Sequence, residues 1–182
     1  RFSEEMGEPI LLRIVTRLAH SRSGVEHKAE QPQNDLAFSD DPRQFILLPG
    51  NARKRYKVLL QRQEEFIKAS EESPYNRYVD GPNKKLGIVA CGIGYNYLME
   101  SYPKGCEYPV LKIGQYPLPK KQLMKLVDEC DEILVLEDGQ PFVEKQLKGY
   151  LGRGVKVKGR LDGTLSTDGE LTPDSVARAV GK

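Results

Sequence analysis

Long apolar runs are missing from this chain of 182 residues. No stretch approaches the roughly 20 apolar residues that a helix needs to span a bilayer, and the opening letters RFSEEMGEP contain no signal-peptide core. An excess of one charge is also missing, because 28 Lys and Arg stand against 26 Asp and Glu. With 38% hydrophobic residues, this balance argues against a disordered chain and against a strongly basic nucleic-acid binder. We expect a globular protein of the cytoplasm that engages neither membrane nor nucleic acid.

Cysteine is scarce, and its three positions do not suit a metal site. Cys91, Cys106 and Cys130 are widely spaced, with no C-x-x-C pair and no histidine at a ligand-like offset. We therefore predict that the chain itself binds neither zinc nor an iron–sulfur cluster. Cys91 and Cys130 lie within apolar segments, so we expect them to be buried and inert.

The two ends of the sequence suggest a piece of a longer protein. The chain opens with Arg1 rather than Met and passes from a polar, helix-like stretch into the apolar run PILLRIV. At the other end, Thr172 is the expected N-cap of a helix with Pro173 at its first position, yet the chain stops about two turns later. We expect more protein on both sides.

One pattern occurs three times between Leu86 and Leu151: an apolar strand-like run, a break rich in glycine or proline, and an amphipathic helix-like stretch. The three runs are LGIVACG with YNYLMES, PVLKIG with LPKKQLMKLVDEC, and EILVLEDG with PFVEKQLKGYL. Short, continuously apolar strands alternating with helices are typical of a parallel sheet covered on both faces. The sequence therefore predicts a three-layer α/β/α fold with a mainly parallel sheet, in which the alternating VKVKGRL forms an edge strand.

The amino-terminal third carries a different set of signals. The run PILLRIV, residues 9–15, is typical of a buried strand, and the polar, proline-punctuated residues 25–41 are typical of a linker. A helix is predicted from about Ala52 to Ser70, with one apolar side that packs and one solvated side. The letters SPYNRYVDGPNKK, with two prolines and a glycine, predict a loop.

Gly92 and Gly94 lie where a dinucleotide-binding fold places its phosphate-binding glycines. The third glycine of that motif is replaced by Tyr97, and the second strand ends in Gly114 and Gln115 rather than in an acid. We therefore expect these glycines to allow close packing of strand and helix, without a nicotinamide cofactor.

Glu137 and Asp138 end the third apolar strand. A carboxylate at this edge can act as an acid or base, but adjacent strand-end residues point to opposite sides of a sheet. Capping by Asp138 or Gly139 of a helix that starts at Pro141 is the favoured interpretation. We predict no catalytic residue here.

Two cationic clusters are candidate binding sites. The first follows the PILLRIV run and combines cations with hydroxyls, which suits carboxylate or phosphate recognition as well as it suits a solvated turn or an interface ion-pair patch. Its members are Thr16, Arg17, His20 and Ser21.

The second cluster is a basic run at the expected start of the long helix, where the macrodipole disfavours cations. An anionic partner or a solvated helix face would both explain it. Its members are Arg53, Lys54 and Arg55.

Taken in order, PILLRIVTRLAHSRSGVE, LGIVACGIGYNYLMES, YPVLKIGQYPLPKKQL, DEILVLEDGQPFVEKQLK and GELTPDSVARAV resemble the alpha subunit of indolepyruvate ferredoxin oxidoreductases. The resemblance implies that residues 1–28 are the tail of a pyrimidine-binding domain, that residues 29–44 are a linker, and that residues 45–182 form a domain similar to the transketolase C-terminal domain. The thiamine diphosphate-binding domain with its metal motif and the domain with the cluster cysteines would lie beyond Lys182.

The same resemblance implies what the parent protein does. With thiamine diphosphate, Mg and 4Fe-4S clusters, it would oxidatively decarboxylate a 2-oxo acid such as indolepyruvate to an acyl-CoA and reduce ferredoxin, with a beta subunit and a second alpha subunit as partners. This chain would bind none of these cofactors and be inactive alone, a structural and interface portion in which Arg17 and His20 lie nearest the parent's substrate or cofactor cleft.

Two other interpretations compete with this one. A free-standing flavodoxin-like or receiver-like module would bind an anionic ligand or a protein partner, although VACG supplies none of the paired acids of a receiver. A nucleic-acid-binding module would depend on the basic helix alone, and the near-neutral charge of the chain argues against it.

Overall fold

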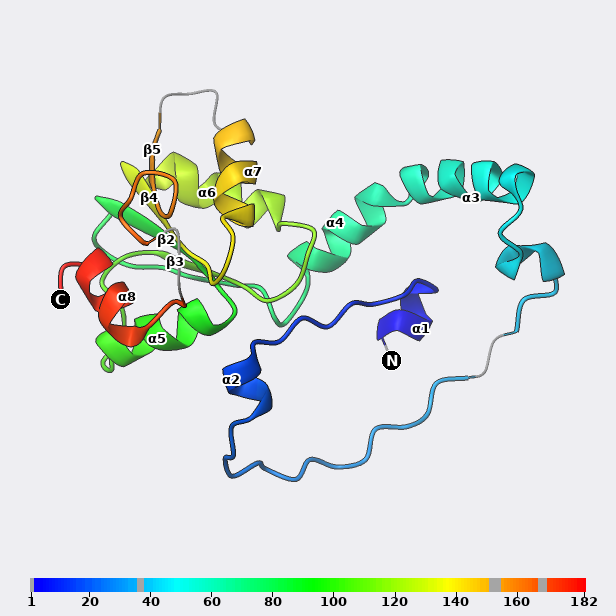
Figure 1. Ribbon diagram of the computed structural model, residues 1–182, viewed down its shortest axis with the longest axis horizontal. Helices are drawn as coiled ribbons and strands as arrows, with labels where there is room; N and C mark the ends of the chain where they lie inside the picture. Colours follow the sequence, from blue (N-terminus) through cyan, green and yellow to red (C-terminus); the bar gives the residue numbers. More distant parts are fainter. Residues whose placement is uncertain (1, 36–37, 151–154, 167–169) are drawn as a thin grey trace. The chain divides into compact units, whose positions relative to one another are not determined.

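The computed structural model describes residues 2–35, 38–150, 155–166 and 170–182. The chain divides into two compact units, residues 1–57 and 58–182. The first unit contains only short helical elements until the start of a longer helix near its end (Figure 1). These are α1 (Phe2–Met6), α2 (Thr16–Ala19), the 3-10 helix η1 (Pro42–Phe45) and the beginning of α3 (Pro49–Gln61).

The expected buried strand in the first unit is wrong for this chain. Residues 9–15 form no strand, and Leu11 and Leu12 are 93% and 82% exposed. A strand pairs its backbone with a neighbouring strand, and within the described part of the chain no strand precedes β1, which begins at Arg77. Phe45 and Leu47 are exposed in the same way, at 79% and 88%. The first unit therefore presents apolar side chains that it does not itself cover.

The single helix expected between about residues 52 and 70 is two helices in the structure. Helix α3 ends at Gln61, and α4 runs over Gln63–Glu71. The side-chain amide of Gln63 donates to the carbonyl of Leu59 at 2.9 Å, the group that its own backbone N–H would occupy in a continuous helix. The expected packed side is also reduced, because α3 buries no residue and α4 buries only Ser70.

The second unit is built on a five-stranded sheet with the order β1-β3-β2-β4-β5. Strand β1 is antiparallel to β3, and the other neighbours are parallel. The mainly parallel sheet and its edge strand β5 confirm the sequence prediction, whereas β1 lies in a segment predicted as a loop. The strands are β1 (Arg77–Val79), β2 (Leu86–Cys91), β3 (Val110–Ile113), β4 (Glu132–Leu136) and β5 (Lys156–Lys158).

Helices cover both faces of this sheet, which confirms the predicted three-layer architecture (Figure 1). Helices α5 (Ile93–Ser101) and α8 (Pro173–Ala179) pack on one face, and α6 (Lys120–Glu129) and α7 (Phe142–Tyr150) on the other. Successive strand residues supply the two cores in alternation, because their side chains point to opposite faces. Thus Ile88 faces α5 and Val89 faces α6, and both are fully buried.

Several local predictions are confirmed in the second unit. The Thr172 hydroxyl accepts a hydrogen bond from the Ser175 backbone N–H, and Pro173 opens α8. Cys91 and Cys130 are buried and unpaired. Burial raises the pKa of the Cys91 thiol, which keeps this side chain protonated and unreactive.

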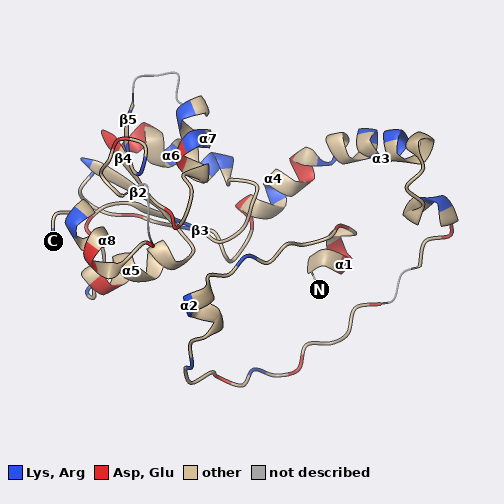
Figure 2. Cartoon of the chain, in the orientation of Figure 1, with Lys and Arg blue, Asp and Glu red and all other residues tan. Residues whose placement is uncertain are grey.

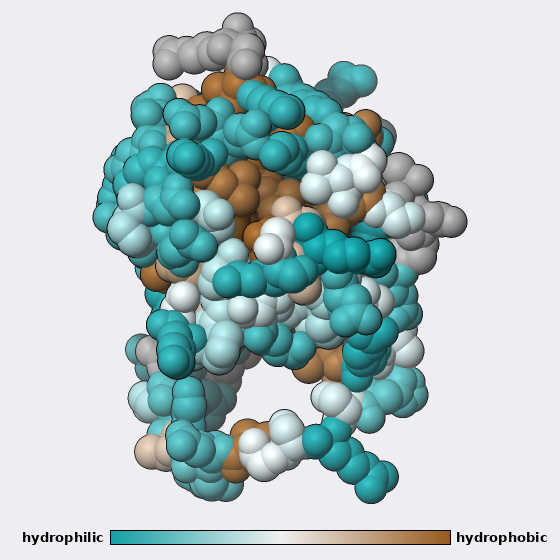
Figure 3. Space-filling view, turned by 90° about the vertical axis from the view of Figure 1, so that its left-hand side faces the viewer, coloured by the Kyte–Doolittle hydropathy of each residue, from teal (hydrophilic) through white to brown (hydrophobic). Residues whose placement is uncertain are grey.

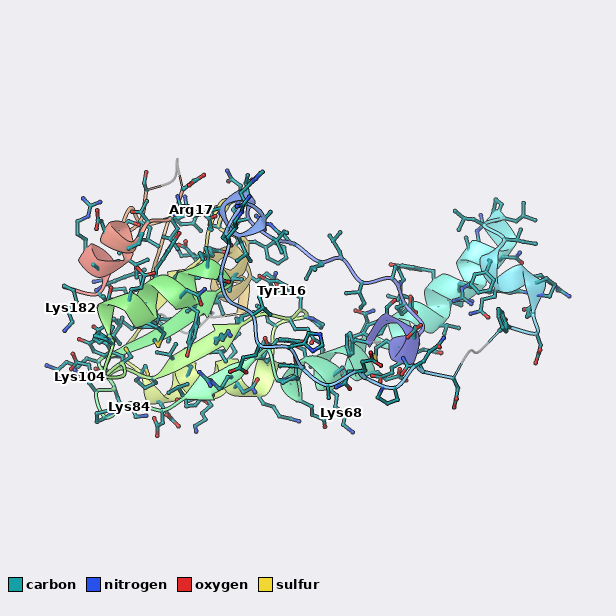
Figure 4. All side chains as sticks on the ribbon, turned by 90° about the horizontal axis from the view of Figure 1, so that it is seen from below. Arg17, Lys68, Lys84, Lys104, Tyr116 and Lys182 are labelled. Atoms are coloured by element: carbon teal, nitrogen blue, oxygen red, sulfur yellow. The ribbon has the colours of Figure 1, made fainter. Side chains whose placement is uncertain are left out.

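Ion pairs border the amino edge of the sheet. The Lys84 ammonium lies between the carboxylates of Asp80 and Glu129, and Lys158 and Lys156 both pair with Glu132 of β4. Figure 3 faces this side of the molecule and shows apolar atoms framed by charged and polar residues. In Figure 4, Lys84 and Lys104 lie at this end of the sheet and Tyr116 lies at the opposite, carboxyl end. Acids of the same unit thus compensate the charges of Lys84, Lys156 and Lys158.

Candidate functional site at the carboxyl edge of the sheet

In a sheet of this topology, the position where a ligand is expected lies between β2 and β4. From β2 the chain crosses to β3 on one side, and from β4 it crosses to β5 on the other. Adjacent parallel strands whose connections leave in opposite directions open a crevice at their carboxyl ends, where ligands of such sheets bind. The loops that border this position begin at Gly92 and at Glu137.

The two glycines after β2 serve backbone geometry. Gly92 has a φ of 52°, a conformation that costs glycine little and other residues more. A Cβ on Gly94 would lie 2.8 Å from the carbonyl oxygen of Leu136, at the end of β4. Gly94 therefore lets α5 approach β4 closely, the packing role expected for it from the sequence.

Glu137 directly follows β4 and so borders the crevice. Its carboxylate is fully engaged in hydrogen bonds with backbone N–H groups. It accepts hydrogen bonds from the N–H groups of Phe142, Val143 and Glu144 at 3.0, 2.8 and 3.1 Å. These donors are the otherwise unpaired N–H groups of the first turn of α7. The expected cap by Asp138 or Gly139 is wrong, because a longer side chain one or two residues earlier reaches across the turn.

A second buried network holds the loop that follows β5. Arg160, 3% exposed, donates to the carbonyls of Glu137 and Ser166 at 3.2 and 2.7 Å. The buried Glu144 carboxylate accepts from the backbone N–H groups of Arg160 and Leu161 and pairs with the Lys148 ammonium at 3.1 Å. These charged groups satisfy each other, as buried charges must. They position the loop and leave little capacity for chemistry.

Asp138 joins the same loop to the end of β4. Its carboxylate accepts from the Leu171 backbone N–H at 2.9 Å and lies 3.8 Å from the Arg160 guanidinium. Both acids that the sequence places at this strand end therefore hold backbone in place.

Asn76 organises the end of β3, a role that the sequence analysis missed. Its side-chain oxygen accepts from the N–H groups of Gly114 and Gln115 at 2.9 and 3.0 Å, and its amide donates to the carbonyls of Ser70 and Gln115 at 2.9 and 3.0 Å. The Ser70 hydroxyl in turn donates to the carbonyl of Pro117. An Asn before a short strand gives only a weak local signal, because its partners lie about 40 residues away along the chain.

Two aromatic side chains stand beside this loop. Tyr116, which follows β3, and Phe142, which begins α7, meet edge to face with ring centroids 5.7 Å apart. Both are about half exposed, at 50% and 54%, and Tyr116 marks the carboxyl end of the sheet in Figure 4. They give this edge an apolar character.

The residues of the first predicted cluster lie in and directly after the short helix α2 of the first unit. Thr16 and Arg17 open α2, His20 ends it, and the Ser21 hydroxyl donates to the Leu18 carbonyl at 2.7 Å. Contrary to expectation, the cluster does not follow a buried strand, because residues 9–15 find no pairing partner. All four members of the cluster are exposed.

The second predicted cluster lies on an exposed helix. Arg53, Lys54 and Arg55 follow the first turn of α3, which begins at Pro49 (Figure 2). The expectation that they sit at a helix start is wrong. The field of the macrodipole fades beyond the first turn, so the argument from misplaced cations no longer favours an anionic partner.

Among the described residues, no group of three His, Cys, Asp or Glu side chains is placed to hold a metal ion. Glu137 and Asp138 are already engaged with backbone N–H groups. Within the same residues, no helix is both long and apolar enough to cross a membrane.

The sequence of the chain is similar to those of known proteins. No protein-family model matches the chain. It is similar to proteins named indolepyruvate oxidoreductase subunit IorA, from Methanothermobacter thermautotrophicus (33% identity over 98% of this chain), Archaeoglobus fulgidus (30% over 99%) and Pyrococcus abyssi (30% over 99%). The chain spans 29% to 30% of the length of these relatives.

Proposed function

We propose that the chain is a segment of an indolepyruvate oxidoreductase subunit similar to those named IorA. Within such a subunit it would be a structural and interface portion without catalytic groups of its own. The observation that carries the proposal is that nearly the whole chain aligns with less than a third of each relative. The engaged state of Glu137 and Asp138 supports it.

The proposed parent decarboxylates indolepyruvate or a related aryl pyruvate oxidatively, transfers the acyl group to coenzyme A and reduces ferredoxin. Thiamine diphosphate, Mg and 4Fe-4S clusters would be held by other parts of the parent, which would assemble with a beta subunit and a second alpha subunit. Within this chain, residues 1–28 would be the tail of a pyrimidine-binding domain, 29–44 a linker, and 45–182 a transketolase C-terminal-like domain.

Exposed apolar side chains support the interface role. Leu11, Leu12 and Leu47 are all more than 80% exposed, and burying an apolar side chain of this size is favourable by about 1.5–3 kcal/mol. In the parent, such side chains would be covered by neighbouring domains or subunits.

The test uses the intact parent protein and the isolated chain side by side. We expect indolepyruvate-dependent, coenzyme A-dependent reduction of ferredoxin by the parent and none by the chain.

In the parent, Arg17→Gln and His20→Gln should each raise the KM for the 2-oxo acid, because we propose that these residues lie nearest its cleft. His27→Gln, in the polar stretch that follows, is the matched control and should leave KM unchanged. Activity of the isolated chain would overturn the proposal, and unchanged kinetics of both variants would remove the assignment of Arg17 and His20.

A further inference from the structure

Two cations occupy directly opposite positions on neighbouring strands of the sheet. Arg77 of β1 and Lys112 of β3 are direct partners in the antiparallel register. Like charges at such positions destabilise a sheet. At the amino edge Lys84, Lys156 and Lys158 pair with acids, whereas within the described part of the chain neither Arg77 nor Lys112 forms an ion pair. The repulsion between the two cations lowers the stability of the folded chain, and a bound anion would relieve it.

Tyr95, in the first turn of α5, fixes both cations on one face of the sheet. The guanidinium carbon of Arg77 lies 5.9 Å and the ammonium of Lys112 4.9 Å from the centroid of the tyrosine ring. The face of the ring attracts cations, so it reduces the freedom of two long side chains. Arg77 also donates from Nη2 to the Tyr95 hydroxyl oxygen at 2.6 Å. Since that oxygen accepts this bond, the hydroxyl hydrogen is left to donate elsewhere.

The three groups therefore present hydrogen-bond donors and two positive charges to the same space. A phosphate group carries about −1.5 to −2 charges at neutral pH and several strong acceptor oxygens, and the arginine fork matches its geometry. A single carboxylate would neutralise only half of the charge. The cluster also lies toward the carboxyl edge of the sheet, the side on which ligands of parallel sheets bind. The geometry points to Arg77, Lys112 and Tyr95 as a binding site for the phosphate group of a small-molecule ligand.

This assignment goes beyond the proposed structural role and does not depend on it. It is tested on the chain itself by calorimetric titration with inorganic phosphate and with glycerol 3-phosphate, at constant ionic strength. Inorganic phosphate should bind, and Arg77→Gln combined with Lys112→Gln should weaken this binding by at least about tenfold. Tyr95→Phe, which keeps the ring and removes the hydroxyl, should weaken it by about threefold. Lys85→Gln removes an exposed cation near the amino edge and should leave binding unchanged.

Three results would overturn the assignment: unchanged binding by the double variant, acetate binding as tight as that of phosphate, or no binding of either phosphate compound to the native chain up to about 50 mM. Binding of the free ion alone would still support the site and identify inorganic phosphate as its ligand. Binding of the ester as well would identify a phosphorylated metabolite.

Thermal unfolding provides an independent readout. Without phosphate, Lys112→Gln should raise the melting temperature, because it removes a like-charge contact. Phosphate should raise the melting temperature of the native chain and have little effect on the double variant, since a ligand stabilises only the protein that binds it. A lower melting temperature of Lys112→Gln in phosphate-free buffer would show that the two cations are not opposed as described, and would contradict the site.

Discussion

At the scale of single residues, three acidic side chains at the end of β4 and in α7 hold backbone in place. Glu137, Asp138 and Glu144 all accept hydrogen bonds from main-chain N–H groups. Glu137 is the clearest case, because it stands at the end of a central strand and satisfies three donors of one helix terminus. Its removal should therefore affect stability through α7.

Glu137→Gln should lower the free energy of unfolding by about 1–3 kcal/mol, since its amide nitrogen would face backbone donors and leave at least one buried N–H group unpaired. Urea unfolding followed by circular dichroism measures the change. Glu100→Gln, at an exposed position of α5, is the control and should remain within about 0.5 kcal/mol of the native chain. A loss at Glu137 no larger than that of the control would contradict the capping role.

Lys84 donates hydrogen bonds to Asp80 and Glu129 at the amino edge. Its hydrogen bond to Glu129, together with one from the Tyr78 hydroxyl, lowers the pKa of Glu129 below the ordinary 4.5. A carboxyl whose pKa is lowered by folding stabilises the protein above pH 4.5, and this contribution is lost as the pH falls through the lowered pKa.

Lys84→Met should therefore raise the pKa of Glu129 and reduce the dependence of stability on pH below 4.5. Carboxyl carbon NMR follows the titration of Glu129 directly. Lys85→Met changes a neighbouring exposed lysine and should leave that titration unaltered. If Glu129 titrates identically in both variants, the described hydrogen bond does not set its pKa.

At the scale of elements, the close contact between α5 and β4 requires glycine. A methyl group on Gly94 would meet the backbone of Leu136 at 2.8 Å, whereas one on Gly149, in the last turn of α7, would meet nothing within 4 Å. Both glycines lie in helices, but only Gly94 is packed against a strand. Gly149 can therefore serve as the control for a substitution of Gly94.

Gly94→Ala should lower the free energy of unfolding by about 1–3 kcal/mol, because the helix must move away from the strand. Gly149→Ala should raise it by as much as about 1 kcal/mol through helix propensity alone. Chemical denaturation of both variants under the same conditions tests the pair. Equal effects of the two substitutions would rule out the close contact as the reason for Gly94.

The sequence predicts best those elements whose signal is local. The apolar runs of β2, β3 and β4 and the amphipathic helices that follow them are each encoded within about ten residues, and the α/β/α layers follow from their alternation. Strand β1 is missed because three residues between a proline and a glycine carry too little pattern, and it forms only by pairing with β3. The roles of Asn76 and Glu137 likewise depend on backbone groups that only the folded chain brings near. The run 9–15 has the pattern of a strand, but a strand needs a pairing partner, and the described residues supply none for it.

At the scale of the whole molecule, burial is confined to the carboxyl-terminal part of the chain. Among the described residues, none before Ser70 is buried, and the buried apolar side chains all lie between Ile88 and Val180. Residues 58–182 form a compact unit with their own two cores. The stability measured for the full chain should therefore reside in this unit.

A chain of residues 58–182 should unfold in one cooperative transition, with a melting temperature within about 2 °C of that of the full chain, because the removed residues contribute no buried core. Scanning calorimetry measures both. In limited proteolysis of the full chain, the first cuts should fall between residues 20 and 41, where the described backbone lacks helices and strands. A much lower melting temperature of the shorter chain would show that the first 57 residues help to hold the second unit together.

The exposed leucines near the amino terminus have a consequence for biosynthesis. Leu11, Leu12 and Leu47 leave the ribosome before any strand of the sheet, yet completion of that sheet does not bury them. These side chains are therefore made before the sheet and are still uncovered when the sheet is complete. We expect these residues to bind chaperones and to be accessible to proteases for as long as no partner surface covers them.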